Sequence, residues 1–184
     1  EKIEVSDVKV KNSMVHIAMP VFDAHLKGRI DERGNIMGTY EKGPKYTRVP
    51  FEAIYDIHFR FPKQTTTHKP IAGNWEVTFS PGTEDSYKAK GVFVDGEDNT
   101  ISGTFLTETG DYRFLEGALD NGKLKLSAFD GAHAFYFDGT VKEDSIVGGM
   151  FYSGNHYKEP WLAKRKEAYE LTNPEKLTFL KKGY

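Results

Sequence analysis

The sequence predicts an all-β protein in which an antiparallel meander closes into an up-and-down barrel of about eight strands. Val, Ile, Phe, Tyr, Trp and Thr supply 59 of the 184 residues, whereas Ala and Leu supply 21. β-Branched and aromatic residues favour strands. Four hairpin-like repeats point the same way, because in each of them apolar arms that contain glycine flank a polar turn. The turns lie at 31–35, 95–99, 120–122 and 142–145. Asp, Asn and Gly supply the positive φ angles that most tight hairpins need.

The N-terminal segment, residues 1–61, has the alternation expected of further strands. We expect them at 3–10, 15–19, 24–31, 35–40 and 51–60. These strands would form the later part of a second barrel-like module, or they would extend the sheet of the barrel module at 71–168. The composition of residues 62–70 is that of a linker, because Thr, Lys and Gln lie there between two prolines.

The barrel module is expected to span residues 71–168. Its strands are predicted at 74–79, 87–94, 100–107, 112–119, 123–129, 134–141, 145–152 and 161–165. Eight strands are usual for a small up-and-down barrel, and closure would remove exposed edges. Glycines inside the strands are interpreted as barrel corners.

The last segment, residues 169–184, changes character. Asn173 and Pro174 match a helix cap and first turn, and Gly183 follows two lysines as a stop signal. A short helix over about 174–181 is therefore expected.

The start of the barrel module carries a short motif. Gly73-Asn74-Trp75 resembles the Gly-x-Trp pattern at the first strand of lipocalin/calycin-like barrels, in which the Trp plugs one end. The resemblance implies a structural role for Trp75, as would an ordinary core position.

Composition excludes several classes of function. The chain has no Cys, so it can form no disulfide and no thiolate metal site. Its net charge of -2 gives no basic footprint for nucleic acid. Its apolar stretches are all shorter than the ~18 residues of a membrane span. No cofactor is expected.

One polar turn is a candidate rim for a ligand or partner. Thr107, Thr109, Asp111 and Arg113 lie close together along the chain. The competing interpretation, which we favour, is a turn whose side chains bond their own backbone.

Two later loops hold the remaining candidates. Asp130 and His133 follow the fifth strand of the barrel, and Ser153, His156 and Glu159 follow the seventh. In an up-and-down meander these loops open at the same end. His133 and His156 are weak metal-ligand candidates, since imidazole and carboxylate groups bind zinc, and the same groups could exchange protons in hydrolysis. Structural hydrogen bonding is the favoured alternative.

Four runs of sequence resemble the region upstream of the thioredoxin-like domain in bacterial TlpA/ResA-like thiol–disulfide oxidoreductases. They are 103–117, 129–135, 153–156 and 177–184. The resemblance implies a protein of the bacterial cell envelope, periplasmic or extracellular after export. It also implies a downstream thioredoxin-like domain as a partner. No redox residue can be carried over, because the chain lacks Cys.

Three functional hypotheses follow, and a non-enzymatic role is favoured. The first is a non-catalytic module that binds a small ligand or envelope protein, or positions the thioredoxin-like domain. The second is a lipocalin-like carrier of a small apolar ligand, although the many aromatic residues predict a filled interior. The third is a metal-dependent or acid–base hydrolase that uses Asp130, His133, His156 and Glu159.

Overall fold

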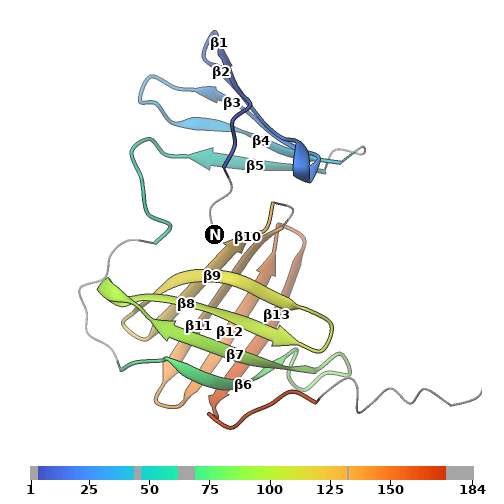
Figure 1. Ribbon diagram of the computed structural model, residues 1–184, viewed down its shortest axis with the longest axis vertical. Helices are drawn as coiled ribbons and strands as arrows, with labels where there is room; N and C mark the ends of the chain where they lie inside the picture. Colours follow the sequence, from blue (N-terminus) through green and yellow to red (C-terminus); the bar gives the residue numbers. More distant parts are fainter. Residues whose placement is uncertain (1–3, 44–46, 62–68, 132, 173–184) are drawn as a thin grey trace, which may run out of the picture. The chain divides into compact units, whose positions relative to one another are not determined.

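The computed structural model describes residues 4–43, 47–61, 69–131 and 133–172 (Figure 1). It confirms the all-β fold class, with a closed antiparallel barrel of eight strands and a separate sheet of five strands. The helix expected over 174–181 lies outside the described residues. Within them, no helix has the length and hydropathy needed to cross a bilayer.

The first sheet is an open meander in the order β1-β2-β3-β4-β5. Its elements are β1 (Val8–Lys11), β2 (Met14–Met19), the short 3-10 helix η1 (Pro20–Phe22), β3 (Ala24–Ile30), β4 (Ile36–Lys42) and β5 (Thr47–Ala53). Pro50 lies inside β5, opposite Thr39. An edge strand tolerates proline because one side of its backbone needs no ladder partner. The sequence prediction placed this strand at 51–60, so it began too late and ended too late.

The eight predicted barrel strands are all present. They are β6 (Gly73–Phe79), β7 (Tyr87–Asp95), β8 (Thr100–Thr107), β9 (Asp111–Asp120), β10 (Lys123–Phe129), β11 (Ala134–Lys142), β12 (Ser145–Ser153) and β13 (Tyr157–Arg165), with the 3-10 turn η2 (Glu97–Asn99) before β8. Closure comes from pairing of the last strand with the first, with Trp161 opposite Phe79 and Arg165 opposite Trp75. Figure 1 shows the strands wrapped around a common interior.

Two compact units divide the chain. Residues 1–60 and 129–134 form one unit, and residues 61–128 and 135–184 form the other. The linker at 62–70 and the segment 169–184 remain predictions, because most of their residues lie outside the described part of the chain.

The barrel interior is filled by aromatic side chains. The largest fully buried ones are Trp75, Trp161, Phe79, Phe93, Phe105, Phe137 and Phe151. Phe105 on β8 reaches across to Phe137 on β11 at 4.8 Å and to Trp161 on β13 at 5.3 Å between ring centroids. Rings that meet from opposite walls leave the centre of the barrel occupied, as the sequence predicted.

Trp75 closes the end of the barrel where β6 begins. It is completely buried, and its indole N–H donates to the carbonyl of Ile71 at 2.9 Å. The Arg165 guanidinium lies 4.6 Å from the ring centroid, a favourable cation–π position. Arg165 also donates to the carbonyls of Ala72 and Pro70. The structural role expected of Trp75 is therefore observed.

On the outer face of the barrel, Glu76 binds Lys88 and Lys166, each at 2.8 Å. Hydrogen bonds from Lys166 and Lys88 lower the pKa of the Glu76 carboxyl from 4.5 to about 2. A pKa lowered by folding contributes stability that is present above the unfolded value and lost as pH falls toward the folded one. We expect urea midpoints of the wild-type protein and of Glu76→Gln to differ above pH 5. The difference should shrink between pH 4.5 and pH 2, and a difference that stays constant over this window would contradict the assignment. The effect is modest, because these groups are partly exposed.

Candidate functional site

The most distinctive polar group of the barrel lies at the end opposite Trp75. The connections β6–β7, β8–β9 and β12–β13 meet there, as follows from the strand order. We call this end of the barrel the Glu159 end, after its buried carboxylate. Glu159 is 4% exposed and lies on the inward-facing row of β13 with Trp161 and Ala163. Interior positions alternate with exterior ones along a barrel strand.

The Glu159 carboxylate accepts hydrogen bonds from neutral hydroxyl groups. The Tyr87 hydroxyl donates to Oε1 at 2.7 Å, and the Ser80 hydroxyl donates to Oε2 at 2.7 Å. Tyr157 is a further hydrogen-bonding neighbour of Glu159. Hydrogen bonds to an ionised carboxylate are short and stronger than neutral ones.

Burial raises the pKa of Tyr87, and the hydrogen bond to Glu159 raises it further. Burial, then the charge of Glu159 and the hydrogen bond to it, raise the pKa of Tyr157. Burial likewise raises the pKa of Tyr112, although its hydrogen bond with Tyr87 acts in the opposite direction. These tyrosines therefore remain neutral hydrogen-bond donors at physiological pH.

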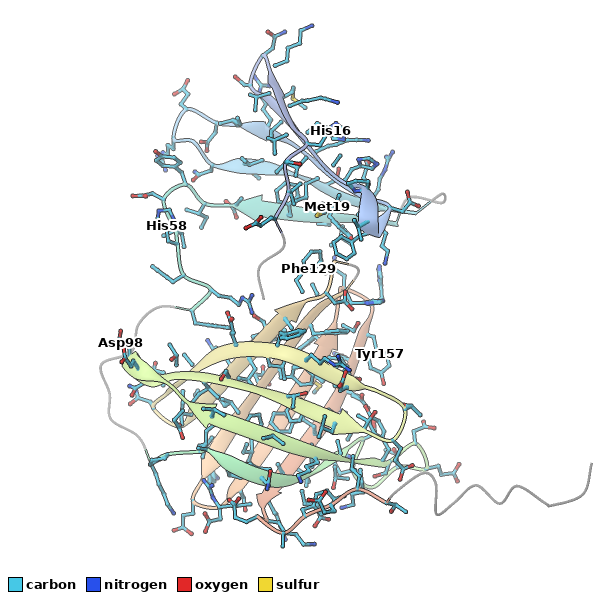
Figure 2. All side chains as sticks on the ribbon, in the orientation of Figure 1. His16, Met19, His58, Asp98, Phe129 and Tyr157 are labelled. Carbon is cyan, nitrogen blue, oxygen red and sulfur yellow. The ribbon has the colours of Figure 1, made fainter. Side chains whose placement is uncertain are left out.

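Aromatic rings pack against Tyr112 and Tyr157, the two tyrosines that neighbour Glu159 together with Tyr87. Tyr112 packs against Phe135 at 5.2 Å and against Phe151 at 5.0 Å between centroids. Tyr157 packs against Phe151 at 6.0 Å, and its side chain is labelled in Figure 2. Tyr157 is 52% exposed, so the Glu159 end reaches solvent through this ring.

The predicted polar turn bonds mainly to itself. The Thr107 hydroxyl accepts from the backbone N–H groups of Gly110 and Thr109 and donates to the Gly110 carbonyl. Arg113 donates to both carboxylate oxygens of Asp111 at 2.7 and 2.8 Å. This arrangement fits the interpretation of a self-bonded turn, and a ligand-binding role for these residues remains a prediction.

The later candidates fall into both units. Asp130 and His133 form a local pair: the His133 backbone N–H donates to Asp130 Oδ1 at 2.6 Å, and His133 Nδ1 lies 3.0 Å from Asp130 Oδ2. This pair belongs to the unit of the N-terminal sheet, whereas Ser153, His156 and Glu159 belong to the barrel unit.

In the part of the chain that the structure describes, no three His, Asp or Glu side chains come close enough to hold a metal ion. The weak metal candidates, His133 and His156, thus have no supporting cluster there.

Sequence reasoning named Glu159 but missed its hydrogen-bond partners Ser80, Tyr87 and Tyr157 and the neighbouring Tyr112. Ser80 and Tyr87 are 79 and 72 residues from Glu159 along the chain. They approach it only because β13 returns to pair with β6. Only their place along the chain could have indicated them. Each of these residues lies within three residues of a strand end, and in a meander those strand ends lie at the same end of the barrel.

Comparisons with known proteins give no family. No protein-family model matches the chain. No curated protein matches it either. A solved structure from Bacteroides fragilis, described as a "putative outer membrane protein", is 16% identical with a TM-score of 0.30 over 88% of this chain and 78% of that chain. A likeness at that level carries no inference about function. These comparisons name no thiol–disulfide oxidoreductase, so that resemblance rests on the sequence motifs.

Proposed function

We propose that this chain is a non-catalytic binding or positioning module, and that the Glu159 end of the barrel is its contact face. The filled interior is the observation that carries the proposal. Because rings from opposite walls meet inside the barrel, any partner or ligand must be recognised at an end or on an outer surface. The Glu159 end combines a buried carboxylate with the half-exposed ring of Tyr157, and aromatic residues are enriched in interfaces.

The module belongs, in this proposal, to an exported protein of the bacterial cell envelope and accompanies a thioredoxin-like domain. The four sequence runs at 103–117, 129–135, 153–156 and 177–184 support this part. The chain has no Cys, which agrees with the proposal that another domain of the same protein carries the reactive thiols.

The two alternatives receive less support. A lipocalin-like carrier needs an internal cavity, whereas Phe79, Phe105 and Trp161 occupy the centre of this barrel. The hydrolase would need Asp130, His133, His156 and Glu159 together. In the structure Asp130 instead contacts His133, and Glu159 contacts hydroxyl groups.

The proposal is tested by reading the gene downstream of the codon for Tyr184 and purifying the full-length product. We expect a thioredoxin-like domain with a Cys-x-x-Cys site. The full-length protein should reduce insulin disulfides, and the present chain alone should not. Backbone NMR spectra of the chain alone and within the full-length protein should differ over a contiguous patch, as expected of a positioning module.

Two outcomes would overturn the proposal. One is turnover of a disulfide, ester or phosphate substrate by the present chain alone. The other is spectra of this chain that are identical in the two contexts, together with no saturable binding at the Glu159 end.

A further inference from the structure

The protein has two buried carboxylates in its described residues, and their partners differ. Glu41, in the N-terminal sheet, is 6% exposed and lies 2.6 Å from the Lys27 ammonium and 3.3 Å from the Arg48 guanidinium. Glu159 is 4% exposed, yet among the described residues its side-chain partners are hydroxyl groups and no Lys, Arg or His lies within ion-pair distance.

A buried charge without a counter-charge is unusual. Glu and Asp are almost never fully buried unless they are paired, because removing a charge from water is costly. Hydrogen bonds from Ser80 and Tyr87 offset part of this cost. A carboxylate has about four lone-pair sites, so the hydroxyl groups of Ser80, Tyr87 and Tyr157 leave capacity for about one further donor.

The surroundings of Glu159 favour a positive ligand. Aromatic faces attract cations. Tyr157, a hydrogen-bonding neighbour of Glu159, carries a half-exposed ring. Burial, and then the charges of Glu159 and Asp85 among other groups, raise the pKa of Tyr157, so two carboxylates lie near this ring. Because Tyr157 is half exposed, a cation can approach it from solvent.

We propose that the Glu159 end binds a primary ammonium group, as carried by a lysine side chain of a partner. The ammonium would donate to the Glu159 carboxylate and lie against the Tyr157 ring. One of its N–H donors can use the remaining acceptor capacity of the carboxylate, which a quaternary ammonium ion could not use. This inference deepens the binding role proposed above and rests on it.

The test is an NMR titration of the full chain with n-butylammonium and with Nα-acetyl-lysine N-methylamide. The same lysine derivative acetylated at Nε is the neutral control, and tetramethylammonium tests the quaternary alternative. We expect saturable shifts at the Glu159 end with a Kd on the order of 1 mM for both primary ammonium probes. The neutral derivative should bind at least about tenfold more weakly. Stronger binding of the lysine derivative than of n-butylammonium would indicate a peptide as the source of the ammonium.

Variants locate the site. Glu159→Gln should weaken ammonium binding by about 30-fold or more, since it removes the charged partner. Tyr157→Ala should weaken it about fivefold, and Tyr157→Phe should leave it nearly unchanged because the ring remains. Glu170→Gln, at an exposed carboxylate that pairs with Lys90, is the matched control and should bind as the wild type does.

Equal binding of the ammonium and the neutral probe would overturn the inference, as would binding that survives Glu159→Gln. If Glu159→Gln fails to fold, the Tyr157 variants decide, because Tyr157 is half exposed. Absence of ammonium binding would leave the positioning role intact if full-length spectra still differ from those of the isolated chain, so the two proposals fail separately.

Discussion

Replacing Phe79 by alanine is expected to lower the free energy of unfolding by about 3–5 kcal/mol. Phe79 is completely buried. Its ring packs against rings from β7, β8, β9, β11, β12 and β13, at centroid distances from 4.9 to 6.5 Å. Truncation would remove these contacts at once and leave a cavity that walls of paired strands cannot collapse to fill.

Urea unfolding monitored by tryptophan fluorescence measures this loss, because both tryptophans, Trp75 and Trp161, lie in the barrel core. Phe114→Ala is the control: Phe114 is 55% exposed, and its truncation should change stability by no more than about 0.5 kcal/mol. If the two variants lose similar free energies of unfolding, the ring contacts of Phe79 do not contribute the expected stability.

Replacing Gly117 by alanine is expected to destabilise the barrel by about 3 kcal/mol, at the upper end of the usual cost of overpacking. Gly117 lies in β9 opposite Leu126 of β10. An added Cβ would overlap the backbone carbonyl oxygen of Lys125. A backbone atom of a paired strand cannot move aside as the end of a flexible side chain can, so β9 and β10 would have to separate.

Gly110→Ala provides the matched control, because nothing lies within 4 Å of a Cβ added at Gly110 and its φ is not positive. There the substitution should be neutral or stabilise by roughly 0.4–1 kcal/mol through the unfolded state. Thermal unfolding of both variants by circular dichroism makes the comparison. If the Gly117→Ala variant is as stable as the wild type, β9 and β10 can separate locally without a loss of stability, and the prediction is wrong.

The barrel could be predicted from sequence because each hairpin is a local signal. Turn residues, glycine-containing arms and alternation all lie within about twenty residues of one another. Seven of the eight predicted barrel strands begin and end where the structure places them or one residue away. The last strand shows the limit. Its predicted start was Trp161, yet β13 begins at Tyr157. Pro160 is accommodated opposite Met150 and accepts a hydrogen bond from the Ser80 N–H through its carbonyl.

The candidate site was less accessible to sequence reasoning for a physical reason. Glu159 could be named from its position in a loop region rich in polar residues, but its burial could not be known. Inward orientation depends on the register of β13, and the predicted range of 161–165 left Glu159 outside that strand. The tyrosines around Glu159 come from different hairpins, and only the closing pair of strands brings them to it.

That closing pair has a further consequence for the chain itself. Because β13 lies beside β6, the two ends of the barrel segment are neighbours, with the Lys166 N–H donating to the Asn74 carbonyl at 2.9 Å. The closed sheet therefore does not require the chain to begin at β6 and end at β13. A short peptide joining these ends, with new termini opened at the Asn121-Gly122 turn, would preserve every strand pair. We therefore expect the barrel to tolerate circular permutation, as domains with neighbouring termini commonly do.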